Sequence, residues 1–413
     1  MYDIIIIGGG PAGMTAAIKA KEACMDAEVL IIDRNKKIGK KLYATGNGKC
    51  NLANTELDLS SYHSQNEFFP YQFITVQSSS DVVGFMNELG VRCYTDKGYI
   101  YPASLQASTV VWALSDRLKQ LGVEVHTSEN VVRVESCDTG YEIYTESSNY
   151  RTRVLIAAPG GPAAPKLGGT DAMYGILKNM GVNVIKPHPA LCKLRCAEDI
   201  SELTGARSKA VAKLMCEAQE YDRESGEIQF ADRYLSGIAI FNLSMQCIDL
   251  LLENRSPVIE LEYVPHITET ELENYIFSFI ERNALRRPEA MLNGLVHEKV
   301  SRYILERLGI HKNTVSDLLE RDIKDICNAV KHMSFSINGY GGYDDSQASC
   351  GGIDTRMLRA DNLEVDGHRN LFAVGECVDV TGKCGGFNIT WAIISGMRAG
   401  ENAGKRLSDD KNK

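Results

Sequence analysis

The chain has 413 residues, of which 44% are apolar and 24% charged, and its formal net charge is −9. This composition is typical of a globular protein and argues against disorder; at roughly 100–200 residues per domain it predicts two to three domains. The overall field of an acidic protein does not attract nucleic acid or anionic membranes, so neither is an expected partner, although a local basic patch such as Arg282, Arg286 and Arg287 remains an alternative. No apolar run is long enough for a membrane span or a signal core, and we expect a cytoplasmic protein.

The twelve cysteines are scattered along the chain, and no Cys-x-x-Cys pair occurs. Several lie in apolar segments, as reduced thiols of a protein core do. Neither their spacing nor that of the histidines is typical of a zinc site. The sequence therefore predicts no metal site.

The chain opens with a strand, a glycine-rich turn and a helix. Residues 3–7 are an apolar, β-branched run, as in a strand buried on both faces of a parallel sheet. The turn carries Gly8, Gly10 and Gly13 at Gly-x-Gly-x-x-Gly spacing. The first glycine permits the tight turn, the second lets the backbone approach a pyrophosphate, and the third lets the helix over 12–24 pack on the strand.

A second strand over 28–32 ends at Asp33, twenty residues beyond Gly13. An acid at this distance accepts hydrogen bonds from the adenosine ribose hydroxyls. Strand, turn, helix and acid together predict a dinucleotide-binding unit. The unit alone does not distinguish FAD from NAD.

The C-terminal part of the sequence favours FAD over NAD. Residues 153–161 and 370–376 are further apolar strands that end in glycines, and Glu376 follows the second. A glycine-rich loop then enters a long helix near Ile389. This arrangement resembles the two-dinucleotide-fold flavoproteins, which implies an acid on the ribityl chain and a helix N-terminus at the flavin pyrimidine edge. Glu376 stands where Asp is usual in that group.

A closer resemblance rests on segments spread along the chain. They are residues 39–51 (GKKLYATGNGKCN), 160–171 (GGPAAPKLGGTD), 189–191 (PAL), 234–244 (YLSGIAIFNLS), 351–353 (GGI) and 385–388 (GGFN). They resemble the BaiN / aminoacetone-oxidase-type family of NAD(P)/FAD-dependent oxidoreductases, the YhiN-like flavoproteins. The resemblance implies noncovalent FAD in a Rossmann-type domain, with an inserted β-barrel and a multihelical subdomain.

The chain departs from the family pattern at several positions. Tyr99 stands where the family usually has Arg, and Ala163 and Ala164 replace residues that are often Ser and Tyr. Ile238 stands where Pro is common, and residues 349–350 read Ser-Cys in place of Val-Thr. These departures suggest a changed substrate, so we carry over no single member's reaction.

Two loops are expected to face the isoalloxazine from opposite ends of the chain, residues 46–51 and 385–388. Their glycines let backbone reach a flat ring, and Asn51 and Asn388 can bond its polar edge. The full set of predicted cofactor-binding residues is Gly8, Gly10, Pro11, Ala12, Gly13, Asp33, Arg34, Lys41, Gly46, Asn47, Gly48, Lys49, Cys50, Asn51, Val132, Gly160, Gly161, Gly375, Glu376, Gly385, Gly386, Phe387, Asn388 and Ile389.

Within this set, Lys49 can offer positive charge to a phosphate or to reduced flavin. Cys50 is expected to be a small residue beneath the ring rather than a redox thiol. No catalytic residue is assigned.

The predicted fold is α/β, with a discontinuous FAD-binding domain over 1–193 and 343–413. A β-barrel-like domain is expected over 194–266, from short β-like runs that include VAKLMCEA, GEIQFAD, IAIFNLS and VIELEYV. A helical subdomain is expected over 267–342.

The helical subdomain begins with a capping-box signature, Thr268 followed by Glu271. Pro288 is expected to end this first helix. Two further helices are predicted near 289–308 and 313–331.

The predicted function is that of an FAD-dependent oxidoreductase, with hydride transfer between flavin N5 and a small organic substrate. Reduction of an enone-type C=C bond and oxidation of an amine both have precedent in the family that the chain resembles. No second dinucleotide motif follows a strand, so NAD(P)H is expected at most as a transient donor. Two alternatives remain, a non-enzymatic flavin electron carrier or sensor and a flavin-dependent RNA-modification protein.

Overall fold

The structure, a computed structural model, describes residues 1–411, without the side chains of residues 59, 410 and 411. The chain divides into two compact units, Met1–Pro189 with Ser346–Lys413, and Ala190–Asp345. Each unit has a hydrophobic core of its own. The domain borders expected from the sequence, after residue 193 and before residue 343, lie a few residues from these divisions.

A mainly parallel sheet forms the centre of the first unit, with strand order β7-β2-β1-β10-β9-β8 and β19 beside β10. The strands are β1 (Tyr2–Ile7), β2 (Val29–Asp33), β7 (Glu124–Thr127), β8 (Val131–Cys137), β9 (Gly140–Thr145), β10 (Asn149–Ala157) and β19 (Leu371–Ala373). Strand β1 lies parallel to both β2 and β10. Ile4, Ile5 and Ile6 are fully buried, as their unbroken apolar run predicts.

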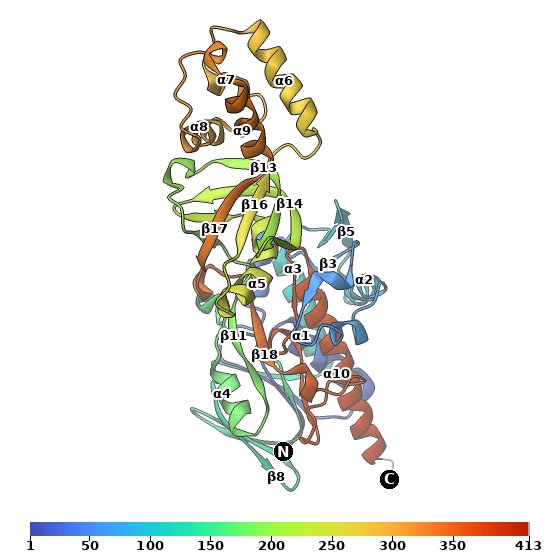
Figure 1. The fold of residues 1–413 in the computed structure, drawn as a ribbon. Coiled ribbons are helices and arrows are strands. Elements are labelled where there is room, and N and C mark those ends of the chain that lie inside the picture. Colours follow the sequence, from blue (N-terminus) through green and yellow to red (C-terminus); the bar gives the residue numbers. More distant parts are fainter. Residues whose placement is uncertain (412–413) are drawn as a thin grey trace. The chain divides into compact units, whose positions relative to one another are not determined.

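Two helices from opposite ends of the chain pack together against this sheet, α1 (Pro11–Ala23) and α10 (Phe387–Lys411) (Figure 1). Small residues spaced four apart form the contact: Gly396, Gly400 and Gly404 of α10 approach Ala12, Ala16 and Ala20 of α1. A Cβ atom on Gly400 would lie 2.2 Å from the backbone oxygen of Ala16. Only glycine allows the helices to lie this close.

The other elements of the first unit surround this core. The helices are α2 (Ser78–Glu88), α3 (Ala107–Gln120) and α4 (Ala172–Asn179). The short strands are β3 (Ala53–Asn54), β4 (Tyr62–His63), β5 (Cys93–Asp96), β6 (Tyr99–Pro102), β11 (Val184–Ala190), β18 (Ala348–Ile353) and β20 (Thr381–Gly382).

The second unit contains a closed barrel with strand order β12-β15-β14-β13-β16-β17. Its strands are β12 (Leu194–Cys196), β13 (Arg207–Cys216), β14 (Gln219–Ala231), β15 (Tyr234–Ser236), β16 (Val258–Glu262) and β17 (Met333–Tyr340). The prediction of a strand at IAIFNLS was wrong, because these residues begin the helix α5 (Ile238–Leu252). Strand β17 lies within the range predicted to be helical and closes the barrel instead.

Helices α6 (Glu269–Arg282), α7 (Pro288–Leu292), α8 (Glu298–Arg307) and α9 (Glu320–Lys331) gather at one end of this barrel (Figure 1). The capping box of α6 is present, since the Thr268 side chain accepts from the Glu271 amide and the Glu271 side chain accepts from the Thr268 amide. The single helix predicted over 289–308 is divided into α7 and α8. The helix predicted from residue 313 starts at Glu320, after a short 3-10 turn.

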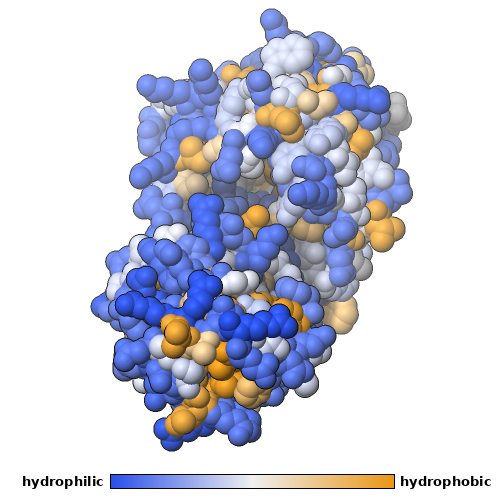
Figure 2. Space-filling view, turned by 90° about the horizontal axis from the view of Figure 1, so that it is seen from above, coloured by the Kyte–Doolittle hydropathy of each residue, from blue (hydrophilic) through white to orange (hydrophobic). Residues whose placement is uncertain are grey.

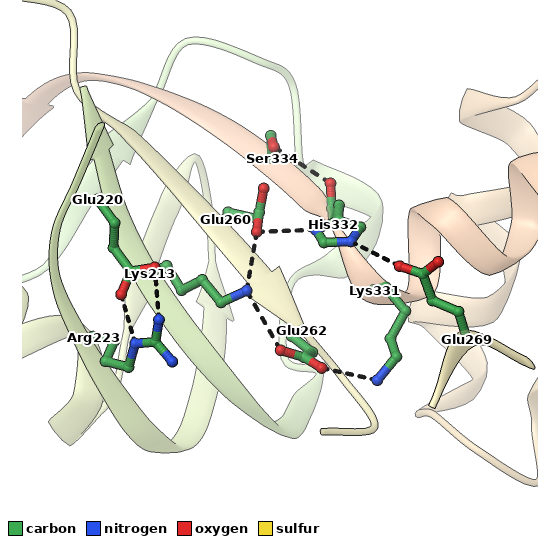
Figure 3. A network of polar contacts seen from close by, with 9 residues as sticks. All are labelled: Lys213, Glu220, Arg223, Glu260, Glu262, Glu269, Lys331, His332 and Ser334. Carbon is green, nitrogen blue, oxygen red and sulfur yellow. Dashed lines mark hydrogen bonds and ion pairs between the residues drawn. The ribbon is translucent and has the colours of Figure 1, made fainter. Parts of the chain in front are cut away.

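A polar network joins the barrel strands to the helices of the same unit (Figure 3). Lys331, almost fully buried at the end of α9, donates to the Glu262 carboxylate at 2.8 Å. Beside it, His332 contacts Glu260 at 3.1 Å and Glu269, the first residue of α6, at 3.4 Å. Strand β16 is thus tied to both α6 and α9.

The face of the molecule in Figure 2 is mostly hydrophilic, and hydrophobic residues interrupt it in scattered groups. Among the described residues, no helix has both the length and the apolar character that a bilayer crossing requires.

Candidate cofactor-binding site

A cleft lies at the carboxyl ends of four parallel strands of the first unit. It is lined by the segments that directly follow β1, β2, β10 and β19, at Gly8, Asp33, Ala158 and Val374. Ligands of open α/β sheets bind at this edge. The cleft encloses about 980 Å³ including its open mouth.

The glycine turn after β1 leaves room for a ligand. Gly8 has a φ of +111°, and a Cβ atom on it would meet the backbone oxygen of Ala158 at 2.1 Å. A Cβ atom on Gly13 would lie 1.9 Å from the Gly8 oxygen, so the helix packs on the strand only with glycine there. A Cβ atom on Gly10, by contrast, would meet nothing within 4 Å. The space in front of Gly10 and the N-terminus of α1 suits a pyrophosphate.

Asp33 is buried at the end of β2, and the protein fixes its orientation. Its Oδ2 accepts from the Gly9 amide at 2.7 Å. Its Oδ1 accepts from the Asn35 amide at 2.7 Å and from the Asn35 side chain at 3.1 Å. Asp33 and Asn35 both line the cleft, so this end has the polar groups that an adenosine ribose requires.

Glu376, the residue expected at the ribityl chain, also lines the cleft. Lys41 donates to its two oxygens at 2.9 and 2.7 Å. Helix α10 holds the preceding residue, because Trp391 Nε1 donates to the Gly375 oxygen and the Gly375 amide donates to Ser395 Oγ, each at 3.0 Å. The acid is therefore positioned by the helix whose first turn faces the same cleft.

The N-terminus of α10 contributes Asn388, Ile389 and Ala392 to the lining. The Asn388 side chain does not have the free amide that we expected to bond the flavin edge. Its Oδ1 accepts from the Gly382 amide at 2.8 Å, and its Nδ2 donates to the Gly382 oxygen at 2.7 Å. Asn388 instead fixes the turn into α10, and the unpaired amides of the helix N-terminus are the donors at this end.

The two loops expected at the isoalloxazine meet at one hairpin. A Cβ atom on Gly46 would lie 3.8 Å from the Tyr101 ring, and one on Gly385 would lie 3.1 Å from the Tyr99 ring. The Asn54 side chain donates to the Gly385 oxygen at 3.1 Å. Loops distant in sequence are thus brought together on β3 and β6.

Cys50 is fully buried, and burial raises the pKa of its thiol to about 12. A protonated, enclosed thiol suits packing rather than redox chemistry. The neighbouring Asn51 has a buried side-chain oxygen with no hydrogen-bond partner among the described residues. An orphaned buried acceptor next to a ligand cleft is a further sign of a group that the protein alone does not supply.

The structure places the predicted residues in two groups. Those that line the cleft are Gly8, Gly10, Pro11, Ala12, Asp33, Lys41, Gly160, Gly161, Glu376, Asn388 and Ile389. Those outside its lining are Gly13, Arg34, Gly46, Asn47, Gly48, Lys49, Cys50, Asn51, Val132, Gly375, Gly385, Gly386 and Phe387. Val132 is half-exposed on β8, which is separated from β1 by two other strands.

Sequence reasoning missed several lining residues, among them Asn35, Thr45, Gln347 and Ala392. Ala392 had a usable signal, since it follows Ile389 by three residues on the same helix face. No sequence pattern marked Gln347, because this residue directly precedes β18 and is brought to the cleft only by the tertiary structure. Among the described residues, no cluster of three metal-ligating side chains occurs.

These observations fit a flavin adenine dinucleotide. The open space at Gly10, the oriented Asp33, the acid at Glu376 and the N-terminus of α10 all border a single cleft. They are the kinds of group that contact the pyrophosphate, the adenosine ribose, the ribityl chain and the isoalloxazine, respectively, in Rossmann-type flavoproteins.

Comparison with known proteins shows the family to which the chain belongs. The family model described as "HI0933-like protein Rossmann domain" matches residues 2–402. The 3-dehydro-bile acid delta(4,6)-reductase of Clostridium scindens is 30% identical over 98% of this chain and 100% of its own length. The ribosomal RNA dihydrouridine synthase of Haemophilus influenzae is 25% identical, over 95% of this chain and 96% of its own length.

Solved flavoenzymes share the fold. A 3-ketosteroid delta1-dehydrogenase from Sterolibacterium denitrificans superimposes with a TM-score of 0.52 at 10% identity, covering 98% of this chain and 99% of its own. A quinol-fumarate reductase gives a TM-score of 0.51 at 14% identity, covering 99% and 72%. At these identities the likeness shows the architecture alone.

Proposed function

Because the chain belongs to the HI0933-like Rossmann family of flavin-dependent oxidoreductases, we propose that it reduces a C=C bond conjugated to a carbonyl group, with noncovalent FAD. The observation that carries the proposal is the single cleft that Gly10, Asp33, Glu376 and the N-terminus of α10 line together. The resemblance to BaiN-type flavoproteins is confirmed by the whole-length match.

Bound FAD supplies hydride chemistry, and the residues of the chain bind and orient it. The N-terminus of α1 and the glycine backbone at Gly10 hold the pyrophosphate, and Asp33 holds the ribose. The pair of Lys41 and Glu376, which lines the same cleft, would contact the ribityl chain. The amides at the start of α10 offer partial positive charge to the pyrimidine edge, which stabilises negative charge there.

The curated relatives favour C=C reduction over amine oxidation. One name describes a delta(4,6)-reductase of a bile acid and the other a synthase of dihydrouridine. In both products a C=C bond next to a carbonyl has become saturated, although the two substrates differ greatly in size and charge. The departures at Tyr99, Ala163 and Ala164 point to a substrate of this chain's own.

Anaerobic half-reactions test the proposal. The purified yellow protein is mixed with NADH, NADPH and a panel of amines, and flavin bleaching is followed by absorbance. We expect a nicotinamide to bleach the flavin, and cyclic enones to restore its colour with formation of the saturated ketone. Bleaching by amines, with no reoxidation by any enone, would replace this proposal with amine oxidation.

A second candidate is dihydrouridine formation in RNA, favoured by one basic segment. Residues 34–55 carry six Lys or Arg and no acid, on a chain whose net charge is −9. Arg34, Lys36, Lys37, Lys40 and Lys49 are exposed and form no ion pair within the described part of the chain. Such a segment can bind phosphates despite the overall charge.

A salt titration distinguishes this candidate. A basic phosphate-binding surface predicts RNA affinity that falls steeply between low and physiological salt. Conversion of uridine to dihydrouridine in ribosomal RNA, without turnover of free enones, would make RNA the substrate.

A further inference from the structure

Two tyrosines share one face of the hairpin formed by β5 and β6. Side chains alternate along β6, so Tyr99 and Tyr101 lie on one face while Ile100 and Pro102 are buried on the other. The two tyrosine rings are 6.4 Å apart between centroids. Across the hairpin, Tyr101 is in register with Tyr94.

This pair lies at the flavin end of the candidate site. Gly46, which the Tyr101 ring approaches, directly follows the cleft-lining Thr45. Gly385, which the Tyr99 ring approaches, lies three residues before the cleft-lining Asn388. The adenosine end, marked by Asp33, is the opposite end of the cofactor. The tyrosines therefore border the region where substrate meets the reactive ring.

We propose that the Tyr101 hydroxyl donates the proton to the substrate carbon next to the carbonyl during C=C reduction. This proposal rests on the function proposed above. A reduced nicotinamide supplies the two electrons, and hydride is delivered to the far carbon of the C=C bond. The C=C π pair then takes the Tyr101 proton at the near carbon, and water reprotonates the resulting phenolate.

Three features of Tyr101 support this role. It is half-buried, and its hydroxyl forms no hydrogen bond with any described residue, so the O–H is available to a ligand. Desolvation, together with the nearby Tyr99 and Asp96, raises the pKa of its hydroxyl, so it keeps its proton at neutral pH. Its backbone is held in the middle strand of a three-stranded sheet, β3-β6-β5, which fixes the point from which the side chain extends.

Other tyrosines near the two loops lack these features. The Tyr62 hydroxyl already donates to the Phe387 backbone oxygen at 3.0 Å. Tyr43 and Tyr94 are 43% and 47% exposed, so the protein encloses neither side chain as it encloses Tyr101. Tyr94 is the natural control, since it lies across the hairpin from Tyr101.

Half-reaction kinetics of the holoenzyme test the role. Tyr101→Phe keeps the ring and removes the proton donor. We expect nicotinamide to reduce its flavin at the wild-type rate, and enone to reoxidise it about 10²–10⁴-fold more slowly, the usual contribution of a general acid. Tyr94→Phe should match wild type in both half-reactions. A Tyr101→Phe protein that reoxidises at the wild-type rate overturns the proposal.

A binding measurement that needs no turnover complements the kinetics. Oxidised holoenzyme labelled with ¹³C at the tyrosine ζ carbon is titrated with a steroid enone, and Tyr101→Phe identifies the Tyr101 resonance. We expect the chemical shift of the Tyr101 resonance to change on binding and that of the Tyr94 resonance to remain unchanged. If the enone perturbs the flavin spectrum without moving the Tyr101 resonance, the proposal fails while the proposed function stands. If wild type reduces no enone, the proposed function fails and the proton donor with it.

Discussion

The carboxylate of Asp33 is oriented before any ligand arrives. Donors of Gly9 and Asn35 occupy three of its roughly four acceptor positions. One position remains for a ribose hydroxyl. We therefore expect the acid to contribute to FAD binding without a loss of side-chain freedom at the moment of binding.

Replacement of Asp33 by Ala should weaken FAD binding. The lost charge-assisted hydrogen bonds predict a decrease of about 1.5–3 kcal/mol in binding free energy, which is roughly 10–150-fold in Kd. Titration of apoprotein with FAD, followed by flavin fluorescence, measures the change. The matched control is Asp26→Ala, at an exposed turn of the same unit. Equal affinity of the two variants would show that Asp33 does not contact the ribose.

At this scale the sequence predicted the residues whose roles depend on spacing. Asp33 could be placed because a fixed number of residues separates the glycine turn from the end of β2. The contacts of the Asn388 amide could not be predicted, because its partner Gly382 is brought near by the tight turn of the chain between β20 and α10. Side-chain pairing of that kind leaves no periodic signal.

Among the elements, α10 depends on glycines that face α1. Replacement of Gly400 by Leu places side-chain atoms where the Ala16 backbone already lies, at 2.2 Å for Cβ alone. We expect a loss of about 1–3 kcal/mol of stability from overpacking, and weaker FAD retention because the N-terminus of α10 moves. Urea unfolding and FAD titration measure the two effects.

A glycine without such a contact provides the control. Gly84 is exposed in α2, and a Cβ atom on it would meet nothing within 4 Å. Gly84→Ala should raise stability by about 0.5–1 kcal/mol, through a smaller loss of backbone freedom on folding. If Gly400→Leu is as stable as wild type, the close helix contact is not required.

The barrel strand β16 carries a carboxylate whose ionisation stabilises the second unit. Burial acts to raise the pKa of Glu262, but Lys331 and Lys213 outweigh it and hold the pKa below its usual range. A lowered folded-state pKa means that the stabilisation is complete above the unfolded value of about 4.3 and is lost as the pH falls through the folded value.

Glu262→Gln should therefore destabilise the protein near pH 7 and have a smaller effect near pH 3. Thermal unfolding from pH 3 to pH 7 measures the difference between wild type and variant. Glu281→Gln, at an exposed glutamate of α6, should show no such trend. A Glu262→Gln effect that is constant over this range would contradict the ion-pair explanation.

The segment IAIFNLS was predicted to be a strand but is the start of helix α5. A short apolar run is compatible with a buried strand or a buried helix, and periodicity does not separate them. The run continues to Leu252, which gives 15 residues, too long for a typical strand. The length of the whole apolar stretch was therefore the informative signal, and the seven residues taken alone were not.

For the whole molecule, the division into two units predicts separable behaviour. Every residue that lines the cleft belongs to the first unit. The chain leaves this unit after β11 and returns before β18, and these two strands pair. A short linker in place of residues 190–345 should therefore give a protein that still binds FAD.

Retention of FAD absorbance after gel filtration checks this prediction. Asp33→Ala in the shortened chain serves as control and should remove the colour. A folded shortened chain that fails to bind FAD would mean that the second unit contributes directly to cofactor binding.

The sequence predicted that an insertion exists, but not how its barrel closes. The last barrel strand, β17, follows four helices, about 70 residues after β16. Pairing at this sequence separation is set by tertiary structure. The range predicted as helical therefore included a strand that no local pattern separated from it.

The close packing of α1 on α10 also determines the distance between the N-termini of these two helices. Both helices begin at the cleft, one at the expected pyrophosphate position and the other at the expected flavin end. Their closest contacts place glycines of α10 on alanines of α1, which have no rotamers to exchange, so sliding of one helix along the other would separate backbones already in contact. The spacing between the two anion-attracting ends is then as rigid as the backbone itself, and a dinucleotide binds to a site whose length is already fixed.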